Sequence, residues 1–263
     1  MKRRTVLSRA GGVVGIAVAG SVPATGDSRG SPVATRDTYT LLDGTNHATE
    51  VVVIEGAQSG PTALVTGGIH GDEISGYRAA ETVSGWDIAQ GTLVVIPRAN
   101  TIAIERGTRE GTGGDLNRLF PPGDEPASAL AQALWGAIER HDPDVYIDLH
   151  RSLGIYNVQP GYVGQAIFPT AAGPAVEHAQ AVADILNDEK VPWYMPLHKY
   201  RAGDPMPESG PLIANKVGQD RDTPAYIVES TSFLLDLDTR TDWTTRAADA
   251  LLARHGIERT GGR

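Results

Sequence analysis

Two histidines and one glutamate in this chain have the residue types and the spacing of a metal site. In the segment GGIHGDE, His70 and Glu73 are three residues apart, so on a helical turn their side chains share one face. The chain has no cysteine, and zinc is held well by imidazole nitrogen and carboxylate oxygen. His150, at the end of the segment VYIDLH, is the best candidate for a third ligand. Two imidazoles and one carboxylate leave a fourth tetrahedral position for water, as catalytic zinc sites do.

The elements around these residues predict an α/β fold. Buried strands over residues 62–66, 144–149 and 224–228 lead to His70, His150 and Glu229. Ligands of open α/β sheets bind beyond the carboxyl ends of the strands, so three polar side chains placed there predict one shared site. The alternation predicts a three-layer sandwich with a mixed, largely parallel central sheet and helices on both faces. Further strands are expected over residues 38–42, 49–54 and 92–96, helices over 73–86, 126–140, 175–188, 212–217 and 241–255, and a functional loop over 98–125.

Length and charge narrow the function classes. The 263 residues, 40% of them hydrophobic, suit one domain with extensions. The net charge of −9 argues against a nucleic-acid partner, because phosphate binding needs clustered lysine and arginine. Only 4 of the 23 basic residues are lysine, and this acidic, lysine-poor composition resembles that of halophilic proteins.

The first residues have the pattern of an export signal. The basic start KRR precedes an apolar run over residues 10–22 and then the small residues SVPATG. The paired arginines resemble a twin-arginine signal, which exports folded proteins. We therefore expect a signal and linker over residues 1–36, a zinc hydrolase domain over 37–263, an extracellular or cell-surface location, and membrane contact only through an uncleaved signal.

Four motifs in order carry a family resemblance. The segments GGIHGDE, DLNRLFP, DLHRS and YIVEST resemble the succinylglutamate desuccinylase and aspartoacylase family, which has the zinc carboxypeptidase-like fold. The resemblance covers about residues 63–230. It implies a deacylase that cleaves the amide bond of N-acyl amino acid-like substrates bearing a carboxylate.

The resemblance also implies roles for individual residues. His70, Glu73 and His150 match the ligands of one zinc ion. Asp115 matches a carboxylate that orients the first histidine, which fixes its tautomer and makes it a better ligand. Glu229 matches the general base.

Substrate contacts follow from the same comparison. Asn117 and Arg118 match the pair that binds a substrate carboxylate, a task that suits the two-pronged guanidinium group. A further arginine polarises the scissile carbonyl in the family. Arg109 is the nearest match, and Arg106 and Arg98 are alternatives.

Two departures from the family keep other activities open. The family's named enzymes are intracellular and have a second, β-rich C-terminal domain, whereas here only about 34 residues follow Glu229. A more open site would suit a zinc carboxypeptidase that trims peptides, and a non-catalytic, exported metal- or ligand-binding protein is a third hypothesis. Tyr156 and Tyr200 are candidates for further substrate contacts. The sequence predicts a small-molecule or peptide substrate and leaves the oligomeric state undetermined.

Overall fold

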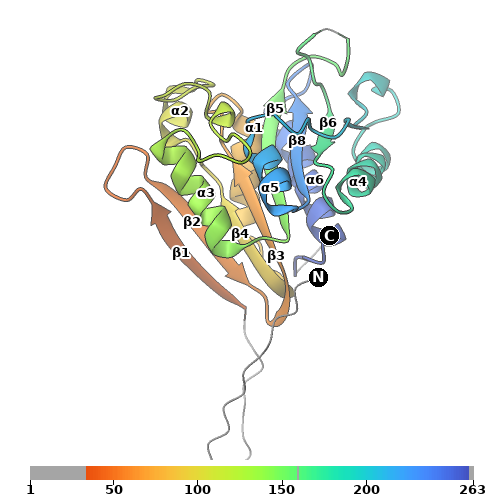
Figure 1. Ribbon diagram of the computed structural model, residues 1–263. Helices are drawn as coiled ribbons and strands as arrows, with labels where there is room; N and C mark the ends of the chain where they lie inside the picture. Colours follow the sequence, from red (N-terminus) through yellow and green to blue (C-terminus); the bar gives the residue numbers. More distant parts are fainter. Residues whose placement is uncertain (1–33, 159, 261–263) are drawn as a thin grey trace, which may run out of the picture. The chain divides into compact units, whose positions relative to one another are not determined.

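The computed structural model describes residues 34–158 and 160–260. These residues form one eight-stranded mixed sheet with helices on both faces (Figure 1). The strand order is β1-β2-β4-β3-β5-β8-β6-β7. The predicted α/β sandwich is confirmed.

The strands are parallel in the centre of the sheet, β1, β2 and β6 are antiparallel to their inner neighbours, and the edge strand β7 is parallel to β6. Parallel pairs join β4 to β3, β3 to β5 and β5 to β8, while β1, β2 and β6 pair antiparallel with their inner neighbours. The carboxyl ends of β3, β5 and β8 therefore meet at one edge, where Figure 1 shows the loops that follow them. The strands are β1 (Thr35–Leu41), β2 (Thr49–Glu55), β3 (Gln58–Gly67), β4 (Gln90–Ile96), β5 (Val145–Ser152), β6 (Ala166–Pro169), β7 (Arg201–Ala202) and β8 (Ala225–Thr231).

Alternating side chains of the central strands fill two separate cores. On β3, Ala63 and Val65 pack into one core, and Leu64 between them packs into the other. Helices α1, α4 and α6 cover the first face, and α3 and α5 cover the second. Because both faces are covered, the central strands read as nearly continuous apolar runs. The helices are α1 (Ile74–Ser84), α2 (Thr101–Arg106), α3 (Ala129–His141), α4 (Ala175–Glu189), α5 (Ile213–Arg221) and α6 (Leu237–Arg254), with 3₁₀ turns at Leu116–Arg118 and Pro196–His198.

The segment over residues 98–125, expected to be a loop, contains a short helix. Helix α2 begins after Asn100, whose side-chain oxygen accepts a hydrogen bond from the Ala103 N–H. It ends at Gly107, which has a left-handed conformation with φ of 61°. The sequence pattern missed this helix because six residues are too few to show a helical period. The short strands β6 and β7 were missed for the same reason.

The predicted export signal and linker lie almost entirely outside the described residues, so that assignment stays a prediction. Strand β1 begins at Thr35, two residues before the expected domain start. Among the described residues, no helix has the length and apolar character needed to cross a membrane.

Helix α1 approaches β5 closely at Gly76, which brings the segment bearing Glu73 to the strand bearing His150. A Cβ atom at Gly76 would lie 2.3 Å from the Leu149 carbonyl oxygen, a backbone atom that cannot turn away. Glycine is therefore required here by packing, although it weakens a helix interior by about 1 kcal/mol relative to alanine.

Replacing Gly76 with alanine should destabilise the protein by about 1–3 kcal/mol, because overpacking outweighs the gain in helix propensity. The matched control is Gly136→Ala in α3, where no atom lies within 4 Å of the added Cβ. It should stabilise the fold by about 0.5–1 kcal/mol. Chemical denaturation of both variants measures the difference, and a stabilising Gly76→Ala would contradict the packing argument.

Candidate metal centre and its cavity

Three neighbouring strands deliver the candidate site residues to one edge of the sheet. His70 and Glu73 lie between the end of β3 and the start of α1, and His150 and Glu229 lie near the ends of β5 and β8. His150 and Glu229 are direct partners in the parallel register. Their side chains share the sheet face that α3 and α5 cover, because each is an even number of residues from Tyr146 or Ile227, which pack into that core. Strand order and register thus bring together residues about 160 positions apart.

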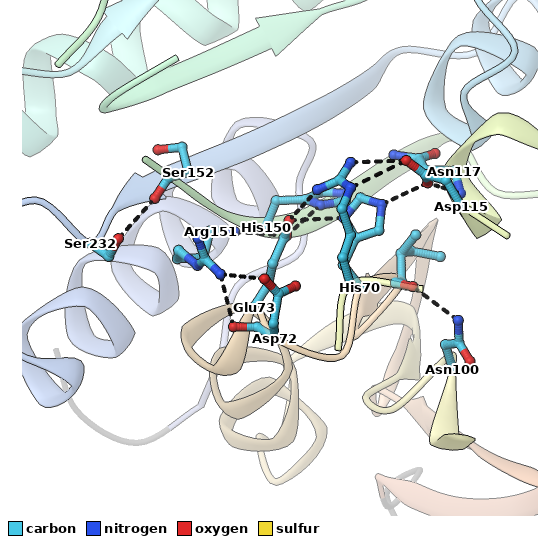
Figure 2. A network of polar contacts seen from close by, with 12 residues as sticks. His70, Asp72, Glu73, Asn100, Asp115, Asn117, His150, Arg151, Ser152 and Ser232 are labelled. Carbon is cyan, nitrogen blue, oxygen red and sulfur yellow. Dashed lines mark hydrogen bonds and ion pairs between the residues drawn. The ribbon is translucent and has the colours of Figure 1, made fainter. Parts of the chain in front are cut away.

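The carboxylate of Glu73 lies between the two imidazoles. Its Oε1 is 2.9 Å from Nδ1 of His70, and its Oε2 is 2.7 Å from Nδ1 of His150 (Figure 2). One ligand atom from each of the three residues lies within 4.8 Å of the others, and each residue is at most 4% exposed. The structure thus gathers the three predicted ligands, in a buried pocket small enough for a single ion.

Two further groups hold the Glu73 carboxylate. Arg109 donates from Nη1 to Oε1 at 3.1 Å, and the backbone N–H of Arg151 donates to Oε2 at 2.9 Å. Burial alone would raise the pKa of Glu73. The charges and hydrogen bonds of His150 and His70 outweigh burial and hold that pKa well below its usual range. Glu73 is therefore ionised across the physiological range.

Each imidazole has a second carboxylate on its outer nitrogen. Asp115 Oδ1 accepts from His70 Nε2 at 2.9 Å, and Asp148 Oδ2 lies 2.9 Å from His150 Nε2. The bond to Asp115 keeps the proton of His70 on Nε2 and turns its Nδ1 lone pair inward, towards Glu73, whereas Asp148 acts on His150 as a neighbouring negative charge. Asp115 was expected in this position. Asp148 was not, although it stands two residues before His150 on the same strand face, a signal that the segment DLH contains.

The donor set and its electrostatics fit a divalent cation such as zinc. Burial would lower the pKa of both histidines, but the neighbouring carboxylates raise the pKa of His70 and raise that of His150 well above its ordinary value. The carboxylates thus stabilise positive charge at the place where two inward Nδ1 atoms and one carboxylate converge. Two nitrogens and one oxygen, with no thiolate, form a set that zinc accepts.

Glycine makes room for the segment that carries His70. A Cβ atom at Gly71 would lie 1.9 Å from the backbone carbon of Ala103 in α2, so only glycine fits. The Gly71 N–H also donates to the Thr108 carbonyl oxygen at 3.0 Å. These contacts fasten the β3–α1 loop to the segment that carries Arg109.

The candidate metal centre opens into a cavity of about 510 Å³. This volume is within the roughly 300–1,000 Å³ range of small-molecule sites. His70, Glu73, His150 and Glu229 are part of its lining. Another part of the lining comes from residues 204–207, after β7, together with Phe168 of β6 and Leu212, and the sequence patterns gave no indication of this part.

Asn117, Arg118 and Arg109 also line the cavity. The Oδ1 atom of Asn117 accepts from the Ile213 backbone N–H at 3.1 Å, which leaves the amide Nδ2 as the group available to donate. The guanidinium of Arg118 is exposed and bonds only through Nη1 to the Asn117 carbonyl oxygen. Arg109 donates three of its five N–H groups to Glu73 and Asp115, so two N–H groups remain to bind a ligand.

The remaining candidates, two arginines and two tyrosines, differ in whether they line the cavity. Arg98 pairs with Glu81 at 2.7 Å, and neither Arg98 nor Arg106 lines the cavity. Tyr156 does line it. Tyr200 is buried in the core and bonds Ser230 Oγ at 2.7 Å, so its position is structural.

Glu229 differs from Glu73 in its surroundings. Its Oε2 is covered and has no hydrogen-bond partner among the described residues. Burial, aided by the charge of Glu73, raises the pKa of Glu229 to about 7. A carboxylate that can both take and release a proton near neutral pH suits acid–base chemistry.

Comparison with known proteins identifies the family. Residues 59–199 match the succinylglutamate desuccinylase/aspartoacylase catalytic domain. The chain is 37% identical over 99 residues to N-alpha-acetyl-L-2,4-diaminobutyric acid deacetylase of Halomonas elongata, over 35% of this chain and 28% of that enzyme. The region that matches the family, residues 59–199, ends before Glu229.

Solved structures share the fold. The mDAP-bound form of Csd4, a D,L-carboxypeptidase of Helicobacter pylori, has a TM-score of 0.62 at 21% identity, over 76% of this chain and 52% of that one. A succinylglutamate desuccinylase from Silicibacter has a TM-score of 0.56 at 18% identity, over 82% of this chain and 63% of that one. At such identities the likeness concerns the fold alone. The chain spans less than two thirds of the length of each of these three proteins.

Asp148→Asn should weaken zinc binding about 10–100-fold, because the negative charge beside Nε2 of His150 is lost. One ion per chain should still bind. The matched control is Asp184→Asn, an exposed aspartate on α4, which should bind zinc as the unaltered protein does. Competition with a chelating dye measures both affinities, and equal affinities for the two variants would remove Asp148 from the metal centre.

Proposed function

The chain belongs to the succinylglutamate desuccinylase/aspartoacylase family, and from this membership we propose that it is a zinc-dependent hydrolase of N-acyl amino acids. The observation that carries the proposal is the pairing of His150 with Glu229, which puts an unpartnered carboxylate oxygen beside a compact His-Glu-His cluster. A metal centre with an adjacent carboxylate that has no structural partner is the arrangement that metal-assisted hydrolysis requires.

In this proposal the metal centre and Glu229 act on the amide bond. Zinc, held by His70, Glu73 and His150, supplies Lewis-acid activation of a water and of the scissile carbonyl. Glu229 takes a proton from the attacking water and gives it to the leaving amine nitrogen. The raised pKa of Glu229 favours this exchange near neutral pH.

The arginines and Asn117 position the substrate. The two N–H groups of Arg109 that remain free are available to the carbonyl oxygen as negative charge develops on it. The free donors of Arg118 and the Nδ2 of Asn117 bind the substrate carboxylate, which fixes the amide relative to Glu229.

A zinc carboxypeptidase is the second candidate. The guanidinium of Arg118 would bind the C-terminal carboxylate of a peptide as well as that of an acyl amino acid, and nothing in its contacts distinguishes the two. A non-catalytic binding protein is disfavoured, because it would have no role for the buried Oε2 atom of Glu229, which has no hydrogen-bond partner among the described residues.

The test measures kcat/KM of the zinc-loaded protein with N-acetyl amino acids and with C-terminally free dipeptides. We expect the N-acetyl substrates to be preferred. Glu229→Gln should lower kcat about 10²–10⁴-fold with zinc content unchanged, because only proton transfer is lost. Glu208→Gln, a nearby exposed carboxylate outside the cavity lining, is the control. Wild-type rates in Glu229→Gln would disprove the mechanism, and a preference for dipeptides would favour the carboxypeptidase.

We also propose that the protein is exported through a twin-arginine-type signal. Support comes from Arg3 and Arg4 ahead of the apolar run over residues 10–22. Conversion of both arginines to lysine should abolish appearance of the protein outside the cytoplasm. Immunoblotting of cell fractions measures the export of that variant. Unchanged export would rule out the twin-arginine route.

A further inference from the structure

We propose that the cavity is built for an amino acid whose side chain carries a positive charge, and that Asp204 binds this charge. The inference rests on the proposed function, since it concerns the amino acid part of the same N-acyl substrate. It follows from the bonding partners of the charged side chains that line the cavity.

Three carboxylates line the cavity, and two of them already have a task. Glu73 bonds both imidazoles and Arg109, and Glu229, the strand partner of His150, is the base of the proposed reaction. Asp204 has no hydrogen bond or ion pair among the residues that the structure describes, and it stands in the part of the lining formed by residues 204–207. It is therefore the carboxylate of the lining that a ligand can engage.

The two arginines of the lining likewise differ in whether a carboxylate already pairs with them. Arg109 is held by Glu73 and Asp115, whereas Arg118 forms no ion pair in the described part of the chain, although its charge helps to lower the pKa of Asp115. In particular, no ion pair joins Arg118 to Asp204. Arg118 and Asp204 thus line one cavity, and neither forms an ion pair among the described residues. Together they are complementary to a ligand that carries both an anionic and a cationic group. The α-nitrogen of an N-acyl amino acid is an uncharged amide, so a cationic group of such a ligand must be on the side chain.

The backbone holds Asp204 firmly in place. The N–H of Gly203 donates to the Ile167 carbonyl oxygen at 2.9 Å, and the N–H of Met206 donates to the Pro169 carbonyl oxygen at 2.9 Å. Both acceptors belong to β6, so the segment is tied to the sheet on each side of Asp204. A Cβ atom at Gly203 would lie 2.2 Å from the Phe168 ring, which shows how tightly this segment packs. A carboxylate on a fixed backbone can select a ligand, because little ordering is needed on binding.

Apolar side chains line the cavity around these charges. Met206, Leu212, Phe168 and Ile227 all face it, and they suit the methylene groups of an aliphatic side chain. A side chain ending in a methyl group could contact the same atoms but would cover Asp204 without pairing it. A side chain ending in a carboxylate would be repelled. Asp204 thus selects for a cation and against both neutral and acidic side chains.

The experiment compares matched substrates on the zinc-loaded, full-length chain. Nα-acetyl-lysine is paired with Nα-acetyl-norleucine, and Nα-acetyl-2,4-diaminobutyrate with Nα-acetyl-2-aminobutyrate, so that each neutral member has the same carbon chain and lacks only the terminal ammonium. We expect the cationic member of at least one pair to have the higher kcat/KM. Asp204→Asn should lower that preference about tenfold, a modest loss because Asp204 is exposed to solvent. Asp204→Lys should reverse it in favour of Nα-acetyl-glutamate.

Glu208→Gln is the matched control, because it removes an exposed carboxylate four residues away that does not line the cavity. It should leave the preference unchanged, which separates a local contact from the effect of net charge. Equal rates within both pairs, or a preference that survives Asp204→Asn, would overturn the inference while the hydrolase assignment stands. Absence of hydrolysis for all of these substrates would overturn the proposed function and the inference with it.

Discussion

The structure depends on one buried carboxylate that lies between two imidazoles. Glu73 is 4% exposed, and an ionised carboxylate at that depth is stable only if its oxygens are paired. Its partners come from its own loop, from β5 and from the segment that carries Arg109. Each of these must be held to within a fraction of an ångström. The close approach of α1 to β5 at Gly76 and that of the β3–α1 loop to α2 at Gly71 meet this demand.

The lining of the cavity comes from two parts of the fold that differ in construction. Strands β3, β5 and β8 are central, parallel and covered on both faces, and the polar groups that they carry to the cavity bond mainly to one another. Residues 204–207 come from the edge of the sheet, where β6 pairs antiparallel with β8 and β7 is two residues long. Asp204 of this segment lines the cavity without a hydrogen bond or ion pair among the described residues. The central strands thus fix the His-Glu-His cluster, and the edge of the sheet presents a group that a ligand can engage.

The sequence predicted the centre of the molecule better than its edges. His70, Glu73 and His150 could be singled out because residue type, spacing and position after apolar runs all indicated one site. Asp148 could have been found by the same reasoning, since it alternates with His150 on one strand face. Asn117 and Arg118 depended on the family resemblance, because nothing in their local pattern indicates a cavity. Asp204 could not have been found, since its place follows from the pairing of β6 with β8, which joins segments about 60 residues apart and has no local signal.

The segment over residues 204–212 bonds to β6 and leads into α5, but it contributes no atom to the His-Glu-His cluster. Its exposed positions can therefore vary without a direct effect on the three candidate ligands. Under the proposed function, exchanging this segment between related enzymes offers a direct route to altered selectivity, while the residues of the central strands that would carry the reaction stay unchanged. In evolutionary terms, the same separation would let one hydrolytic site serve different amino acids through variation at a single edge of the sheet.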